Sequence, residues 1–211
     1  MTFEVVPASF SGKSYIYEVT PKPAAPFSIV YQNDYQGSGS TNSGFFAMFK
    51  QGTLAMSSFN IVHPVPNEII GVNVSDINET DVWLWQLDPS GNYPDSPWTK
   101  VPSVVGNNVI YNSVSAKDKN LYSVGARDND QIDINFTDGN FGNLPQGTFQ
   151  LFYRQSNGLT YSIKPQQFVG VIVRIPYQSK AGRSETLTLT LSLQYTVSNS
   201  AASESNASIR Q

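Results

Sequence analysis

The chain has 211 residues, with 13 basic and 16 acidic side chains and a net charge of −3. Charged residues make up 14% of it, against roughly a quarter in an average soluble domain, and the scattered basic residues exclude an electrostatic footprint for nucleic acid. The absence of cysteine excludes disulfides, thiolate catalysis and cysteine zinc sites, and it fits a protein made in a reducing cytoplasm.

The first 80 residues combine irregular stretches with short strands. Met1 to Pro7 lacks the positive charge and apolar core of a signal peptide, and no apolar run in the chain approaches the ~20 residues of a transmembrane helix. Pro21 to Pro26 favours an extended polyproline spacer, and Gly37 to Gly44 is typical of an exposed, flexible loop tip. Glu68 to Val74 has the pattern of a strand.

Three more strands are predicted in the middle of the chain. Asp81 to Asp88 is apolar on both faces, which predicts a strand buried on both sides, and a turn at Asp88-Pro89-Ser90-Gly91 ends it. Leu121 to Ala126 and Ile132 to Phe136 are the other two predicted strands.

The most informative stretch is the loop from Asp138 to Gly147, which we call the DG loop. Its glycines admit positive φ, its proline fixes φ and lacks an N–H, and its Asp and Asn side chains can bond their own backbone. We expect an ordered connection between two antiparallel strands, with positive φ at one or more of Gly139, Gly142 and Gly147. The chain resumes an alternating strand from Gly147 to Arg154.

The C-terminal part contains the clearest alternation. From Thr186 to Val197, apolar residues and hydroxyl or amide residues alternate, which predicts one long strand with its leucines towards a core. Val169 to Ile175 is its expected hairpin partner. Ala201 to Gln211 has helix-start chemistry, with Ser203 as N-cap, but is too short to be stable alone, which indicates a fragment of a larger subunit.

These patterns predict a mainly β protein built from antiparallel sheets, of the sandwich or open-barrel type, with the start of a helix at its C-terminus. We divide the chain into a β-rich N-terminal region (1–79), a β core (80–198) and the start of a truncated helical segment (199–211).

The sequence offers weak candidates for catalysis. His63 is the sole histidine; it directly precedes Pro64 and lies beside no recognisable nucleophile motif. Glycoside hydrolysis needs a pair of carboxylates, and nothing in the sequence fixes two of them at the required separation. The available residues are Asp81, Asp88, Asp95, Asp118, Asp133 and Asp138. The three tryptophans, Trp83, Trp85 and Trp98, could stack on sugar rings. Trp83 and Trp85 lie in an apolar strand, however, and are better explained as core residues.

Cofactor sites are equally weak. Asp128 and Asp130 could hold calcium loosely, but Asp133 and Gly139 stand where an EF-hand needs Gly and Glu, and a solvated turn explains them better. The DG loop lacks the Lys-Ser/Thr ending of a phosphate loop and precedes a strand instead of a helix. We therefore expect neither a metal nor a cofactor.

The order and spacing of the DG loop residues resemble the core signature of the J-like baseplate proteins of contractile phage tails. The matching positions are Asp138, Gly139, Gly142, Pro145, Gly147, Tyr153 and Arg154. Similar flanking segments are Trp98 to Val101, Leu121 to Val124, Asp128 to Asp130, and the series Asn199, Ala202, Glu204 and Ile209-Arg210.

Residues 45–87 and Thr186 to Val197 are similar to the wedge-subunit subgroup (gene product 6 type) of T-even-like myophages, so the resemblance covers roughly residues 45–211. The chain departs from the family at Thr137, where glycine is more usual, and after Val197, where it lacks the family's Gly-Gly. The family's following Ala-Pro helical region is also missing, which again indicates a fragment.

The resemblance implies a structural component of the tail baseplate wedge, without enzymatic activity. Such subunits form homodimers when full length, contact other wedge and hub proteins, and join wedges into a ring that rearranges when the sheath contracts. The expected location is the virion, after assembly in the bacterial cytoplasm, with no nucleic acid or membrane as partner. A carbohydrate- or receptor-binding β-sandwich of a virion is the alternative, and a β-rich polysaccharide hydrolase is third.

Overall fold

The structure is a computed structural model that describes residues 2–11, 15–23, 30–37, 39–40, 43–105, 119–156, 162–179 and 181–198. It is mainly β with several antiparallel sheets, which confirms the predicted fold class, and none of the described sheets closes into a barrel. The helical content of these residues is two single 3-10 turns, η1 (Asp128–Asp130) and η2 (Pro165–Gln167). No helix in the described part of the chain is long and apolar enough to cross a membrane.

The chain forms two compact units, each made from separate stretches of sequence. The first unit comprises Met1–Phe3, Thr20–Pro23 and Gln51–Ser156, and the second comprises Glu4–Val19, Ala24–Lys50 and Asn157–Gln211.

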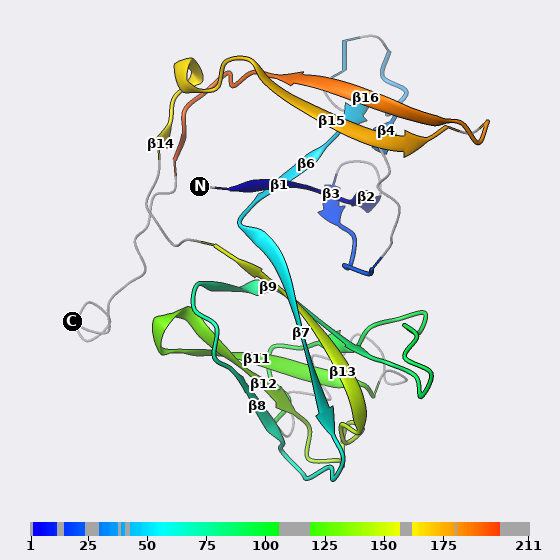
Figure 1. Cartoon of the computed structure of the whole chain (residues 1–211), viewed down its shortest axis with the longest axis vertical. Helices are drawn as coiled ribbons and strands as arrows, with labels where there is room; N and C mark the ends of the chain where they lie inside the picture. Colours follow the sequence, from blue (N-terminus) through cyan, green and yellow to red (C-terminus); the bar gives the residue numbers. More distant parts are fainter. Residues whose placement is uncertain are drawn as a thin grey trace. The chain divides into compact units, whose positions relative to one another are not determined.

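The first unit is a sandwich of two sheets (Figure 1). One sheet has four strands, in the order β10 (Thr99–Lys100), β11 (Leu121–Arg127), β12 (Gln131–Phe136) and β8 (Ile69–Val72). The other has three, with β13 (Gly147–Gln155) between β7 (Thr53–Ile61) and β9 (Ile77–Gln86). All these pairs are antiparallel except the short parallel pair β10–β11.

Alternating apolar residues of both sheets meet to form the core of the first unit. Phe149 and Leu151 of β13 face the buried Ile134 and Phe136 of β12 in one cluster. Trp98 packs edge-on against both Phe136 and Phe149, with ring centroids 5.3 Å apart in each pair. The core therefore explains the alternation of β12, in which every second residue is buried.

A buried tyrosine joins the two sheets. The Tyr122 hydroxyl of β11 donates a hydrogen bond of 2.8 Å to the Val82 carbonyl of β9, and burial raises the pKa of this phenol far above its ordinary value. Because the hydroxyl has a partner, the tyrosine can fill the core without leaving a polar group unsatisfied.

The strands predicted around Glu68 to Val74, Asp81 to Asp88 and Leu121 to Ala126 are found as β8, β9 and β11. The turn predicted after β9 is also present, because the Asp88 carboxylate accepts the N–H groups of Ser90 and Asn92. β9 runs continuously across the boundary placed between residues 79 and 80.

The strands of the second unit pair as two-stranded ribbons. The pairs are β1 (Phe3–Val6) with β6 (Met48–Gln51), β2 (Ala8–Ser11) with β3 (Tyr15–Glu18), β4 (Val30–Gln32) with β5 (Gly44–Phe46), β14 (Ser162–Ile163) with β17 (Val197–Ser198), and β15 (Val171–Gln178) with β16 (Ser184–Leu191). The longest ribbon is β15–β16, which Figure 1 shows in yellow-orange and orange.

The prediction of a single strand from Thr186 to Val197 is wrong in its length. β16 ends at Leu191, and Val197 begins the separate strand β17. The reason is that Leu191 pairs with Val171, the first residue of β15, so the partner strand ends there although the alternation continues. Its hairpin with β15 is confirmed, closed by a turn in which Gly182 has φ of +74°. The predicted helix start at 199–211 lies outside the described residues.

Candidate functional site

The DG loop carries the chain from one sheet of the sandwich to the other. β12 before it belongs to the four-stranded sheet, and β13 after it is the centre of the three-stranded sheet. The two strands therefore do not pair with each other, so the expectation of a simple connection between paired antiparallel strands needs this correction. The physical reason is that both strands present apolar faces to the same core, and facing sheets bury both.

Asp138 organises the first turn of the loop. Its carboxylate accepts the backbone N–H of Asn140 at 2.9 Å and the Asn140 side-chain amide at 2.9 Å. The hydrogen bond from the Asn140 backbone, followed by the one from its side chain, lowers the pKa of Asp138 below its ordinary value. The carboxylate is thus engaged in the loop's own turn.

Gly139 and Gly147 adopt backbone conformations that side chains resist. Their φ angles are +88° and +99°, which confirms the expectation that glycines of this loop have positive φ. A Cβ on Gly139 would also stand 3.1 Å from the Leu144 side chain. The Gly-containing pattern is therefore required by the local backbone.

Gly142 is needed for a different reason, which is close packing. A Cβ there would lie 2.6 Å from Cγ2 of Thr137 and 3.0 Å from the Lys119 carbonyl oxygen. Thr137 is fully buried, and its hydroxyl donates to the Asn143 carbonyl at 3.1 Å. Thr137 therefore packs directly on Gly142, and the absence of a side chain at Gly142 leaves the room that it needs.

Three further hydrogen bonds fasten the loop to residues that precede strands of the four-stranded sheet. The backbone N–H of Asn143 donates to the Lys119 carbonyl at 2.7 Å, and its side-chain amide donates to Asn120 at 2.8 Å. The N–H of Asn67 donates to the Thr137 carbonyl at 3.0 Å. Pro145 is buried, so the loop is tied down at both ends.

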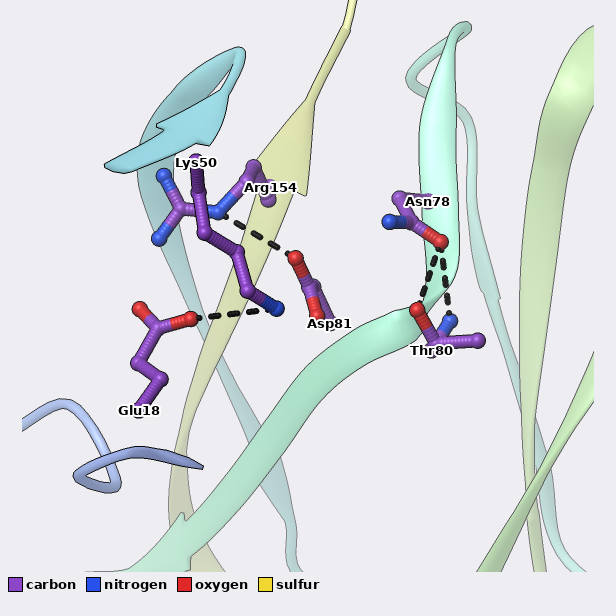
Figure 2. A network of polar contacts seen from close by, with 6 residues as sticks. All are labelled: Glu18, Lys50, Asn78, Thr80, Asp81 and Arg154. Carbon is purple, nitrogen blue, oxygen red and sulfur yellow. Dashed lines mark hydrogen bonds and ion pairs between the residues drawn. The ribbon is translucent and has the colours of Figure 1, made fainter. Parts of the chain in front are cut away.

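The last residues of the motif, Tyr153 and Arg154, are buried in β13. The Arg154 guanidinium lies 3.3 Å from the carboxylate of Asp81 on β9, and both side chains are almost fully inaccessible. Figure 2 shows this ion pair. It also shows the Asn78 side-chain oxygen, which accepts hydrogen bonds from the backbone N–H and the hydroxyl of Thr80. A buried ion pair of this kind is costly to break from one side.

The second unit has an ion pair of its own, between Lys50 of β6 and Glu18 of β3 at 3.4 Å (Figure 2). The Glu18 side chain is buried, and that of Lys50 is partly exposed. Lys50 belongs to the ribbon β1–β6, and Glu18 belongs to the ribbon β2–β3. The ion pair therefore links two ribbons.

A family model described as a domain of unknown function, DUF8360, matches residues 1–196. The chain belongs to the DUF8360 family. No curated protein and no solved structure matches it. The family model includes residues of both compact units.

The weak catalytic candidates are distributed over several elements of this DUF8360 chain. His63 is exposed in the connection between β7 and β8. Asp81 is paired with Arg154, Asp88 closes its own turn, and Asp133 lies 3.5 Å from Arg127. Asp118 lies outside the described residues. Asp81, Asp88 and Asp133 are therefore engaged in local contacts.

The calcium candidates form a strained turn. Asp128 and Asp130 are exposed in η1, and Asn129 and Asp130 both have positive φ, at +60° and +52°. Across the described ranges no group of three acidic or histidine side chains could hold a metal ion. The Asn129 carbonyl instead accepts the N–H of Asp76 at 3.4 Å, which ties the turn to the start of β9.

Two tryptophans are core residues. Trp85 is buried, and its indole N–H donates to the Pro21 carbonyl at 2.8 Å. Trp98 is buried between the sheets, and its indole N–H donates to Gln86 at 3.1 Å. Trp83 is partly exposed on the outer face of β9, so it is less deeply placed than the sequence pattern predicted.

Sequence reasoning missed the residues on which the DG loop rests. The sequence drew attention to Thr137 only as a difference from the baseplate pattern that the chain resembles, yet Thr137 is the packing partner of Gly142. Lys119 and Asn120 precede the loop by some twenty positions, and no local pattern connects them with Asn143. Only an alignment showing paired changes at these positions could have signalled the contact.

Proposed function

We propose that this chain is a structural component of a phage tail baseplate wedge, with no catalytic activity. Its partners are other wedge and hub proteins and, in the full-length protein, a second copy. It is located in the virion and assembled in the bacterial cytoplasm. The ordered resemblance of the DG loop and its flanking segments supports this particular assembly, and the loop residues have scaffold roles, such as the Asp138 turn and the Gly142 packing.

The observation that carries the proposal is the distribution of apolar side chains in the second unit. Among its described residues, the buried apolar side chains are those of Val6, Ala8 and Ile175. Many large ones are instead exposed: Tyr15, Tyr17, Val19, Tyr31, Tyr35, Phe45, Phe49, Val169, Ile172, Tyr195 and Val197.

This distribution fits a unit that completes its packing on other proteins. Two-stranded ribbons are marginally stable when alone, and clustered exposed apolar side chains mark interaction surfaces. Tyrosine and phenylalanine are also the residues enriched in protein interfaces. A structural subunit held among neighbours explains why such ribbons remain in the fold.

The ribbon β4–β5 illustrates the arrangement. Phe46 points inwards and packs edge-on against Phe10 of β2, with centroids 5.3 Å apart. On the opposite face Tyr31 and Phe45 form a cross-strand pair with centroids 5.1 Å apart, and they are 57% and 77% exposed. One face of the ribbon is thus used within the unit, and the other presents aromatic rings to solvent.

Analytical ultracentrifugation tests the proposal. We compare the 211-residue chain with a longer polypeptide that continues past Gln211, at matched concentrations and with purified wedge and hub proteins added. We expect weak association of the chain and at least a dimer of the longer polypeptide, through interfaces of about 800 Å² per partner or more. A double variant, Tyr31→Ala with Phe45→Ala, should weaken co-sedimentation, whereas Val65→Ala in the first unit should not. A strictly monomeric longer polypeptide that binds no tail component would make the proposal untenable.

A second candidate function, binding of glycans or a receptor, is favoured by the loop that joins β4 to β5. Tyr35 is 84% exposed and has φ of +58°, a strained conformation for a bulky residue. The Asp34 carboxylate accepts hydrogen bonds from the Ser40 hydroxyl, the Ser43 hydroxyl and the Gln36 N–H, and these bonds lower the pKa of Asp34. Retention on a glycan array that Phe45→Ala abolishes would rank this function first.

A further inference from the structure

In the three-stranded sheet of the first unit, β7 and β9 are the two edge strands (Figure 1). The two edges differ in the hydrogen bonds that their outward-facing groups make. The outer edge of β9 is covered, because the Leu84 carbonyl accepts the N–H of Trp98 at 2.8 Å and the Val82 carbonyl accepts the Tyr122 hydroxyl at 2.8 Å. β7, at the other edge, pairs only with β13 among the residues that the structure describes.

The hydrogen-bond pattern shows which groups of β7 face outwards. The N–H of Leu87 donates to the Thr148 carbonyl at 2.8 Å, so Thr148 bonds towards β9. In an antiparallel sheet successive residues turn to opposite neighbours, so Phe149 and Leu151 bond towards β7, opposite Phe59 and Ser57. The N–H and C=O groups of the alternate residues, Met56, Ser58 and Asn60, therefore point away from the sheet.

This edge lacks the features that protect exposed strands. Between Thr53 and Ile61 there is no charged residue and no proline, and the register with β13 is continuous over all nine residues. Natural edge strands are usually blunted by lysine, proline or a bulge, because a long unprotected edge pairs with other chains. In the described part of the chain this edge is closed at its start, where the Gly52 N–H donates to the Thr2 carbonyl at 2.9 Å.

We propose that the edge of β7 from Met56 to Asn60 binds an extended segment of another protein, which adds to the sheet as an antiparallel strand. The inference rests on the proposed function, because it supplies the contact by which this subunit would join a neighbour in the assembly. Strand addition of this kind uses main-chain hydrogen bonds for affinity and alternate side chains for specificity.

An extended segment fits this edge better than a second folded copy does. Two folded edges that meet along a few residues bury far less than the ~800 Å² per partner of a stable interface. A segment that wraps along the edge places its backbone and both its faces in contact. The edge carries no charge, so the segment that it selects is uncharged over this length.

The side chains of β7 indicate at which positions the bound segment should be apolar. On the outer face Met56 is 63% exposed and continues a row that includes Phe152 and Trp83. On the inner face Phe59 is only partly buried at the rim of the core, stacked on Phe149 with centroids 5.3 Å apart. Apolar residues opposite Met56 and Phe59, with polar residues opposite Ser58 and Asn60, would extend both faces.

The test uses the full chain and displayed peptides. Random dodecapeptides are selected on the wild-type protein, and the enriched sequences are synthesised and titrated against three proteins: wild type, Ser58→Pro and Ser58→Ala. Because the Ser58 N–H points away from the ladder, proline there removes an outward donor without breaking a bond to β13. We expect Ser58→Pro to keep its urea midpoint and weaken peptide binding by about tenfold or more, and Ser58→Ala to bind as wild type. The Ser57 N–H bonds to β13, so Ser57→Pro should unfold the sheet.

Amide hydrogen exchange locates the bound peptide. The amides of Met56, Ser58 and Asn60 should exchange quickly in the free protein and slowly in the complex, whereas that of Phe59 should be protected in both. The inference is overturned if no peptide is enriched, if enriched peptides bind Ser58→Pro as well as wild type, or if those three amides stay unprotected.

The same variants separate this inference from the proposed function. If Ser58→Pro still co-sediments with wedge and hub proteins while the Tyr31→Ala, Phe45→Ala variant does not, the structural role stands and the contact at β7 is wrong. If the wild-type chain and its longer form bind no tail component but selected peptides still bind at β7, the edge is a docking site and the baseplate assignment is wrong.

Discussion

Gly142 is the position at which the packing of the DG loop can be tested most directly. Alanine there places Cβ 2.6 Å from Cγ2 of Thr137 and 3.0 Å from the Lys119 carbonyl oxygen, whereas carbon atoms in contact prefer about 3.5–4.0 Å. Thr137 cannot retreat freely, because it is buried and its hydroxyl bonds to Asn143. Lys119 is held as well, since its carbonyl accepts the Asn143 N–H.

The expected cost follows from these contacts. Overpacking a buried position costs about 1–3 kcal/mol, and loss of one of the two hydrogen bonds adds about 1 kcal/mol. Because Gly142 does not have positive φ, alanine regains ~0.4–1 kcal/mol by restricting the unfolded chain. We therefore expect Gly142→Ala to lower the free energy of unfolding by about 2–3 kcal/mol.

Urea denaturation followed by tryptophan fluorescence measures this change, with the m-value as a check that the unfolded state is unaltered. Gly91→Ala is the matched control, because its φ is +83° but its Cβ would meet no atom within 4 Å, so it reports the backbone cost alone, about 1 kcal/mol. Thr137→Ser removes Cγ2 and should recover about 1 kcal/mol or more of the Gly142→Ala penalty in a double-mutant cycle. A Gly142→Ala cost no larger than that of Gly91→Ala, or no coupling to Thr137, would refute the packing argument.

Three further predictions concern the same motif. Gly147→Val should cost about 1–2 kcal/mol or more in urea, because φ of +99° is unfavourable for a β-branched residue; an unchanged midpoint contradicts this. Arg154→Met should cost about 3–5 kcal/mol, since it leaves the Asp81 carboxylate buried without its cation, and the double variant with Asp81→Leu should be less destabilised than the sum of the single variants. The lowered pKa of Asp138 means that its ionised form stabilises the fold above the unfolded pKa, and this contribution is lost as pH falls through the folded pKa. Asp138→Asn should therefore reduce the difference between urea midpoints measured at neutral pH and near pH ~3, and an undiminished difference would count against the role of this carboxylate.

Most strands of the sandwich were predictable from the sequence, but their neighbours were not. Local patterning indicated β8, β9, β11, β12 and β13, but not β7 or β10. It does not indicate which strand lies alongside, since any strand with an apolar face can pair with any other. β12 and β13 are separated only by the DG loop and yet belong to different sheets.

Some features of the candidate site depend on residues that are near in sequence, and others depend on residues that are distant in sequence. Positive φ at Gly139 and the Asp138 turn depend on residues within the loop, so the sequence revealed them. The need for Gly142 depends on Lys119, and the burial of Arg154 depends on Asp81 of β9. Distance in sequence hides such pairs, and Asp81 accordingly looked like a possible catalytic carboxylate before the structure placed it beside a cation.

The central position of β13 constrains the order in which the first unit can fold during synthesis. Its neighbours β7 and β9 are both made earlier, and the Gln150 side chain bonds to the Ser57 carbonyl across 93 residues of chain. Until β13 leaves the ribosome, β7 and β9 have no strand to join them, so the three-stranded sheet forms only after Gln155 has been added. Pairing over such separations is slow because a long loop must close first. Nascent chains halted before β13 should consequently be protease-sensitive throughout β7 and β9, and those halted well beyond Gln155 should acquire resistance in a single step.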